Sequence, residues 1–260
     1  MVSNRVPKCY RQNSGCSKTT RRIKTIQKIT RSEIIYFADQ NSFTYGKKSK
    51  SQLYKIITQT IDLLKTKFNP DLIIIGSNTP TLLFKKIFST KIIGISPPLK
   101  EATKITKTNN IVILTTQSAM KSKELTNYVK KNISSKYKVK KINASPLVNL
   151  VESGKFISNQ KFCKKIIKKT LNSVLIDNDI DVAALSSTHL PFLTKLLKEE
   201  FPKVTFLDSA QDVANKVAKL TSKKRSSKNS LKIFTSKNTK QFQNQLKKIG
   251  IKNKVNFLSL

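Results

Sequence analysis

The sequence predicts an α/β protein with two pseudo-symmetric lobes, each built on a mainly parallel sheet flanked by helices. An apolar run at residues 72–75 ends in a polar tip at residues 77–79, and a near-copy of this unit lies 110 positions later, at residues 182–185 and 187–189. A short apolar run bounded by turn residues is typical of a buried parallel strand. Helical apolar patterns follow both tips, and a repeat of this spacing favours two lobes over a solenoid.

The other elements follow from apolar periodicity and turn residues. Strands are expected at residues 33–39, 91–96, 110–114, 138–143, 204–207, 231–234 and 255–258. Helices are expected at residues 19–30, 49–68, 99–106, 121–132, 162–177, 211–220 and 240–249, with a shorter one inside residues 145–154. Residues 1–18 are expected to form a loop, and the Lys/Ser run at residues 222–230 a mobile linker.

The composition is strongly basic. Of the 260 residues 51 are basic and 14 acidic, which gives a formal charge of +37. Such a charge makes non-specific polyanion binding at low salt plausible. However, 45 of the 51 basic residues are lysine, whereas base and phosphate readout favour the arginine fork. The lysines are spread along the whole chain, so a coding bias towards A and T is an alternative explanation.

Several functional classes are excluded by what the sequence lacks. No apolar run is long enough for a membrane span, and the basic, polar N-terminal residues do not resemble a secretory signal. A cytoplasmic location is therefore expected. Cys9, Cys16 and Cys163 are odd in number and irregularly spaced, which argues against a disulfide framework. His189 is the only histidine, and no Cys/His spacing suits a metal site.

The polar tips are the candidate ligand-binding residues. Each follows a predicted strand, and open α/β sheets bind ligands beyond the carboxyl ends of their strands. Ser77 and Ser187 stand at equivalent positions of the two copies, so we expect them to face each other across a ligand cleft between the lobes. Two unrelated strand–helix units would also look alike over eight residues, which leaves the repeat a hypothesis at this point.

Several segments resemble the glutamate racemases of the aspartate/glutamate racemase superfamily, in the same order along the chain. They are residues 33–39 (EIIYFAD), 44–49 (TYGKKS), 77–79 (SNT), 146–154 (PLVNLVESG), 187–191 (STHLP) and 208–210 (DSA). In that family the segment that matches residues 77–79 reads C-N-T, and the segment that matches residues 187–191 reads C-T-H-Y-P. The tail from residue 234 to residue 255 is also similar, so the resemblance covers nearly the whole chain.

This resemblance implies a fold, a chemistry and a set of contacts. The first lobe would comprise residues 1–97 and 209–260, and the second residues 98–208. Family members are isomerases that need no cofactor or metal, bind glutamate between the lobes, and use two thiols on opposite faces of the α-carbon. Dimers are common among them, which makes a homodimer one expectation. The matching substrate contacts are Asn13, Ser14, Tyr45, Gly46, Asn78, Thr79, Thr116, Thr188 and His189.

The chain departs from this pattern at its proton-handling positions. Ser77 and Ser187 stand where the resemblance calls for cysteine, and Asn13 stands where it calls for an acid. A thiol has a pKa of about 8.5, whereas the pKa of an unassisted hydroxyl is far higher, close to that of water. Serine needs an adjacent general base to react. His189 is near enough in sequence to assist Ser187, but no histidine remains for Ser77.

Three functions follow, in order of preference. The first is a racemase-family pseudoenzyme that binds a small acidic amino acid or carboxylate and turns it over weakly or not at all. The second is an active glutamate racemase that uses Ser187 and His189. The third is a lysine-rich protein that binds nucleic acid or another polyanion. The candidate catalytic residues are Ser77, Ser187, His189 and Asn13.

Overall fold

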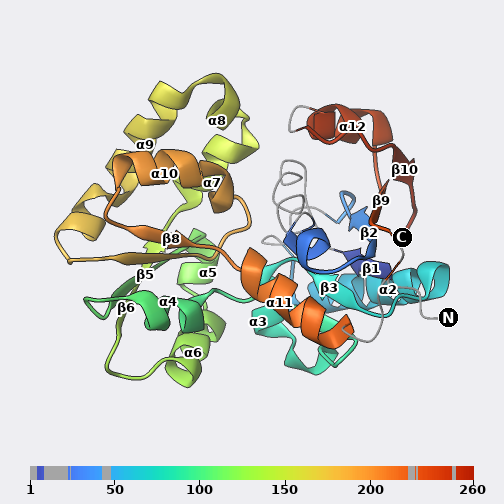
Figure 1. Cartoon of the computed structure of the whole chain (residues 1–260), viewed down its shortest axis with the longest axis horizontal. Helices are drawn as coiled ribbons and strands as arrows, with labels where there is room; N and C mark the ends of the chain where they lie inside the picture. Colours follow the sequence, from blue (N-terminus) through green and yellow to red (C-terminus); the bar gives the residue numbers. More distant parts are fainter. Residues whose placement is uncertain are drawn as a thin grey trace. The chain divides into compact units, whose positions relative to one another are not determined.

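A computed structural model describes the backbone of residues 5–8 and, with their side chains, residues 23, 25–42, 48–221, 226, 228–247 and 250–260. The chain divides into two compact units (Figure 1). Unit 1 comprises Met1–Ile95 and Ala210–Leu260, and unit 2 comprises Ser96–Ser209. Each unit contains one parallel sheet with helices on its faces, which confirms the predicted fold class.

Unit 1 has a six-stranded sheet in the order β10-β9-β2-β1-β3-β4, and all its neighbouring strands are parallel. In chain order the strands are β1 (Arg5–Lys8), β2 (Glu33–Ala38), β3 (Ile73–Ile75), β4 (Ile92–Gly94), β9 (Ser230–Thr235) and β10 (Val255–Phe257). Helices α11 (Ala210–Thr221) and α12 (Thr239–Lys247) contribute to one core cluster, together with Ile23 and Ile26. Helix α2 (Lys50–Phe68) contributes to a second cluster with β3 and β4.

Unit 2 has a four-stranded parallel sheet in the order β6-β5-β7-β8. The strands are β5 (Asn110–Thr115), β6 (Lys138–Asn143), β7 (Val182–Leu185) and β8 (Thr205–Leu207). One face is covered by α7 (Ser145–Glu152), α8 (Lys155–Ser158), α9 (Gln160–Ile176), η3 (Leu190–Leu193) and α10 (Thr194–Glu200). Helices α4 (Leu99–Ile105), α5 (Gln117–Met120) and α6 (Lys123–Asn132) complete the unit (Figure 1).

The two sheets repeat one strand order. The first four strands of unit 1 lie in the order second, first, third, fourth, and the four strands of unit 2 do the same. The repeated sequence motif includes the third strand in each case, β3 in unit 1 and β7 in unit 2. The repeat found in the sequence therefore corresponds to equivalent strands of two similar sheets, with β9 and β10 added to the first.

Strand β1 corrects the sequence prediction, which placed residues 1–18 in a loop. It pairs with β2 on one side and β3 on the other, with Pro7 opposite Ile35. A proline inside a short basic segment argues against a central strand, because proline cannot donate to the ladder. The prediction of a loop was therefore wrong for residues 5–8, because pairing with two strongly apolar strands outweighs the effect of the proline.

The expected linker at residues 222–230 is described in part. Ser226 donates its backbone N–H to the carbonyl of Arg31 at 3.0 Å, and Ser230, the first residue of β9, donates to that of Ser32 at 3.3 Å. The side chain of Asn229 accepts the N–H of Ser32 at 3.0 Å. Residues 222–225 and 227 lie outside the described residues. The end of this segment is thus joined to the residues that precede β2.

Asp181 holds the loop between α4 and β5 against the start of β7. Its carboxylate accepts hydrogen bonds from the hydroxyls of Thr106 and Thr108, at 2.7 and 3.1 Å, and from the backbone N–H groups of Lys107 and Thr108, at 2.5 and 3.3 Å. Burial alone would raise the pKa of Asp181, but these four hydrogen bonds favour the ionised form and together lower the pKa below 3.8. The residue is structural, as its position before a strand suggests.

We predict that Asp181→Asn destabilises the protein by about 1–3 kcal/mol at neutral pH, because the lost charge weakens several hydrogen bonds. The folded pKa of Asp181 is lowered, so its contribution to stability is present above the unfolded pKa and is lost as the pH falls through the folded pKa. The difference in unfolding free energy between the unaltered protein and the Asp181→Asn variant should be constant from pH 7 to about 5. It should become smaller below about pH 4. Urea unfolding at several pH values measures it.

The matched control is Asp177→Asn, an exposed carboxylate at the end of α9. It should produce only a small change in the free energy of unfolding at neutral pH. A difference for Asp181→Asn that does not vary with pH would show that the carboxylate is not the group that holds the loop.

Candidate functional site

The candidate site in unit 2 lies at the carboxyl ends of β5 and β7, which are neighbouring parallel strands. Leu114 pairs with Leu185, and the backbone N–H of Ser186 donates to the carbonyl of Leu114 at 2.9 Å. The strand order changes direction between these two strands, the first and third of the unit. Crevices at such points are where open α/β sheets bind ligands.

Three side chains of unit 2 form a chain of contacts beyond β7. The Oγ atom of Ser187 lies 3.4 Å from Nδ1 of His189, and Nε2 of His189 lies 3.2 Å from Oε1 of Glu152. Ser187 and His189 are buried, with 8% and 4% of their surfaces exposed. The side chain of Glu152 is 37% exposed. The only histidine of the chain therefore lies between a hydroxyl and a carboxylate.

The local backbone explains how Ser187 and His189 come together. They flank Thr188 between β7 and η3, and the backbone N–H of His189 also donates to Ser187 Oγ, at 3.3 Å. Leu190 and Leu193 of η3 are fully buried and hold this turn against the core. Glu152 arrives from a different element, as the last residue of α7.

The arrangement has a definite chemical capacity. A carboxylate that accepts the Nε2–H of His189 leaves the lone pair on Nδ1 facing the Ser187 hydroxyl. An imidazole in this state accepts a hydroxyl proton, and the carboxylate stabilises the imidazolium that forms. Ser187 therefore has the adjacent general base that serine needs.

Thr188 and Thr116, two predicted contact residues, follow the paired strands β7 and β5. Thr188 is buried between Ser187 and His189. Thr116 follows β5 and caps α5, where its hydroxyl accepts the N–H of Ala119 at 3.4 Å. It also lies 3.3 Å from the hydroxyl of Ser118. Both threonines belong to unit 2, at the ends of paired strands.

Ser77, Asn78 and Thr79 belong to unit 1, at the carboxyl end of β3. Ser77 precedes α3 (Asn78–Leu83) and is half-buried, but its hydroxyl makes no capping hydrogen bond to that helix. Among the described residues of unit 1, no carboxylate is hydrogen-bonded to the Ser77 hydroxyl, and the one histidine of the chain belongs to unit 2. Ser77 thus differs from Ser187, which contacts an imidazole.

The position of Ser77 depends on a close approach between α3 and β4. Thr81 of α3 donates its hydroxyl to the Ser77 carbonyl at 2.8 Å. A Cβ atom on Gly94 of β4 would lie 2.4 Å from Oγ1 of Thr81 and 2.7 Å from Cε1 of Phe88. Only glycine fits here, because real Cβ atoms do not approach other atoms so closely.

A buried carboxylate lies at the end of β2. Asp39 is fully buried, and its Oδ1 accepts the hydroxyl of Ser236 at 2.9 Å and the N–H of Ser42 at 3.2 Å. Ser236 Oγ also accepts the N–H groups of Gln40 and Asn41, at 2.9 and 3.1 Å. The residue that follows β9 is therefore hydrogen-bonded to the loop that follows β2.

Several predicted residues cannot be placed. Asn13, Ser14, Tyr45 and Gly46, together with Cys9 and Cys16, lie outside the described residues. Cys163 of α9 is buried in the core of unit 2, where burial raises the pKa of its thiol although Lys155 opposes the change. A raised pKa disfavours the thiolate, as in structural cysteines.

Sequence reasoning missed the role of Glu152. It noted the residue only as part of the segment at residues 146–154, 37 positions before His189. A buried histidine needs a hydrogen-bond partner, and this requirement was the one indication that another polar residue contacts His189. The partner depends on how α7 packs against η3, and periodicity does not reveal it.

Two properties of the described part of the chain bear on its chemistry. No group of three or more His, Cys, Asp or Glu residues there is arranged to hold a metal ion. None of the helices described is both long and apolar enough to cross a membrane.

The comparison with known proteins identifies the family to which the chain belongs. The glutamate racemase of Buchnera aphidicola subsp. Schizaphis graminum is 32% identical over 220 residues, which cover 80% of this chain and 82% of that protein. The chain belongs to the glutamate racemase family. No family model matches it.

Solved glutamate racemases share the fold. Bacillus anthracis RacE1 aligns with a TM-score of 0.80 at 21% identity, covering 98% of this chain and 97% of that one. The Francisella tularensis glutamate racemase, determined in complex with D-glutamate, aligns with a TM-score of 0.78 at 18% identity, covering 98% of each chain.

We predict that Gly94→Ala displaces α3 and destabilises unit 1 of this racemase-family chain by about 1–3 kcal/mol, the usual cost of overpacking. Thermal unfolding gives the stability, and amide chemical shifts of residues 77–83 report the displacement. Thr81→Ala in the same chain removes two of the three clashing atoms and should restore part of the loss. A Gly94→Ala protein with unchanged stability and shifts would contradict the close approach.

Proposed function

We propose that this glutamate racemase-family protein binds a small acidic amino acid or related carboxylate and racemises it weakly or not at all. The observation that carries the proposal is the contact chain from Ser187 through His189 to Glu152, which has no counterpart at Ser77 among the described residues of unit 1. We also propose that the protein acts in the cytoplasm.

The family supports the ligand class. The Francisella tularensis enzyme was determined with D-glutamate, and the Escherichia coli enzyme with L-glutamate and an activator. In this chain the hydroxyls and backbone N–H groups at the ends of β3 and β7 are the kind of donors that hold carboxylates. An acidic amino acid is therefore the ligand to test first.

The chemistry of the two serine positions argues against racemisation. Inversion of an α-carbon requires a proton to leave one face and another to arrive on the opposite face. By the family resemblance, Ser77 and Ser187 stand at the two thiol positions, and a hydroxyl is a much weaker acid than a thiol. Only Ser187 has an imidazole that can take its proton.

The reaction that remains is one-sided. Ser187 Oγ would remove the α-proton while its own proton passes to Nδ1 of His189, leaving the electron pair on the α-carbon, where the carboxylate delocalises it. Reversal of the same steps returns a solvent-derived proton to the same face. The α-proton of one enantiomer would exchange, and its configuration would be retained.

We predict slow exchange of the α-proton with deuterium for only one enantiomer of glutamate or aspartate, without inversion. Proton NMR in D₂O follows the α-proton signal, and chiral chromatography follows the configuration. Glu152→Gln should lower the exchange rate by about tenfold or more, because general acid–base catalysis contributes roughly 10²–10⁴. Glu199→Gln makes the same chemical change on exposed α10 and should leave the rate unaltered.

The outcomes separate binding from catalysis. Calorimetry that detects no binding at millimolar ligand, in a folded sample, contradicts the proposed function. Binding without exchange of either enantiomer supports a purely binding role. Inversion of either enantiomer would instead establish the alternative, an active racemase that uses Ser187 and His189.

We further predict that the triple change Ser77→Cys, Ser187→Cys and Asn13→Asp confers racemisation, because it restores a titratable group on both faces. The measurement is inversion of glutamate followed by chiral chromatography. The matched control is Cys163→Ser in the triple variant, which removes a buried thiol of the core and should leave the gained activity in place. A folded triple variant that binds glutamate without inverting it would show that more than these three groups has changed.

A further inference from the structure

The lysines of unit 2 are not evenly compensated by acids. Residues 121–141 contain eight lysines and a single acid, Glu124. Six of these lysines lie exposed on α6, on β6 and on the loop between them: Lys123, Lys130, Lys131, Lys136, Lys138 and Lys140. We call this set the lysine rim. None of its members forms an ion pair with another described residue.

Helix α9 of the same unit provides the contrast. Its Lys164 lies 2.9 Å from Glu199, and its Lys168 lies 3.1 Å from Glu200. The hydrogen bond from Lys168 lowers the pKa of Glu200, and the hydrogen bond to Glu199 raises the pKa of Lys164. The acids of α10 therefore offset part of the charge of α9, through Lys164 and Lys168. No ion pair of this kind offsets the lysine rim among the described residues.

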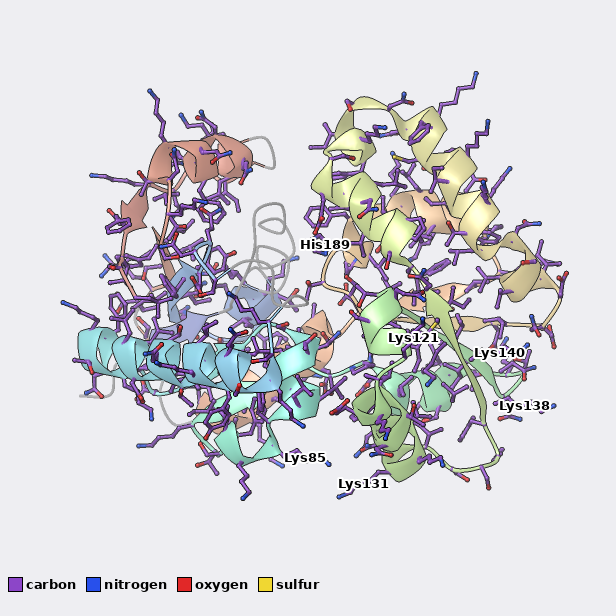
Figure 2. All side chains as sticks on the ribbon, turned by 180° about the vertical axis from the view of Figure 1, so that it is seen from behind. Lys85, Lys121, Lys131, Lys138, Lys140 and His189 are labelled. Carbon is purple, nitrogen blue, oxygen red and sulfur yellow. The ribbon has the colours of Figure 1, made fainter. Side chains whose placement is uncertain are left out.

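Two lysines of the rim lie in a row on one strand. Strand β6 is an edge strand, and Lys138 and Lys140 project from it on the same side, about 6.6 Å apart along the strand. Figure 2 shows these two side chains and Lys131 at the outside of the unit. Lys140 also donates to the side chain of Asn178. A row of fixed positive charges along an extended edge matches a linear polyanion better than a compact anion.

The surroundings of the rim favour phosphate contacts alone. The hydroxyls of Tyr128 and Tyr137 donate to the carbonyls of Pro97 and Thr103, both at 3.1 Å, so both rings are tied to their own unit. Both are half-buried, and the ammonium group of Lys136 lies over the ring of Tyr137, 5.6 Å from its centroid, so stacking of bases is not favoured. The rim contains no arginine, the residue that reads guanine most often.

A membrane surface fits less well. Interfacial binding needs exposed apolar side chains that enter the lipid, in addition to basic residues. None of the large exposed hydrophobic residues of the described chain lies between residues 121 and 141.

We propose that the lysine rim binds the phosphate backbone of nucleic acid without reading its sequence. This interaction surface is independent of the proposed amino-acid site. Lysines on an edge strand also discourage association of sheets between molecules. Nucleic-acid binding and protection of the sheet edge predict different results for two variants that lose the same number of positive charges.

The test compares two triple variants of the full chain. Lys131→Gln, Lys138→Gln and Lys140→Gln remove three charges from the rim, and Lys161→Gln, Lys165→Gln and Lys169→Gln remove three exposed charges from α9. The probe is a fluorescent oligothymidylate of about 20 nucleotides, titrated from about 50 to 200 mM salt. Circular dichroism confirms that both variants are folded.

We expect the rim variant to lose about tenfold or more in affinity at low salt, and the α9 variant less than about threefold. The slope of log affinity against log salt should become shallower by about 2 in the rim variant alone, since each neutralised phosphate of a single strand contributes about 0.7. Equal losses in both variants would overturn the proposal in favour of overall charge. Aggregation of the rim variant with unchanged binding would assign the lysines to edge protection. Preferential binding to phosphatidylserine vesicles in competition with the oligonucleotide would assign them to a membrane.

Discussion

The parallel pairing of β5 with β7 is the constraint on which the site of unit 2 depends. Both strands are buried on both faces, and their register places Leu114 opposite Leu185. Val112 and Leu114 of β5 face the core formed with α9. Because the pairing is parallel, the two strands end together. Thr116 and Ser187 consequently emerge beside each other.

The same features explain what the sequence could predict. Long apolar runs and turn residues located nearly every strand and helix, and the 110-residue offset identified β3 and β7 as equivalent strands before their sheets were known. Burial of both faces leaves a strong continuous signal in such strands. Positions at the ends of strands follow from this, which is why the candidate tips could be named from the sequence.

The parts that could not be predicted depend on contacts between elements distant in sequence. Strand β1 is short, basic and contains Pro7, and only its neighbours β2 and β3 explain its conformation. Glu152 reaches His189 because α7 packs against η3, and no local pattern encodes that distance. The requirement for glycine at position 94 likewise arises from Thr81 and Phe88, whose side chains would collide with a Cβ atom there.

Equivalent strands therefore provide equivalent positions without equivalent chemistry. The strand order is the same in both units, yet Ser187 contacts an imidazole held by a carboxylate of its own unit, whereas no described residue of unit 1 provides either type of group to Ser77. The chain has 14 acids and one histidine, so few positions can carry proton-transfer groups. Some of the acids have structural roles: Asp181 holds a loop, and Glu200 offsets the lysines of α9. In so basic a protein the placement of the remaining carboxylates determines both where an imidazole can act as a base and where positive charge is left uncompensated for an external anion.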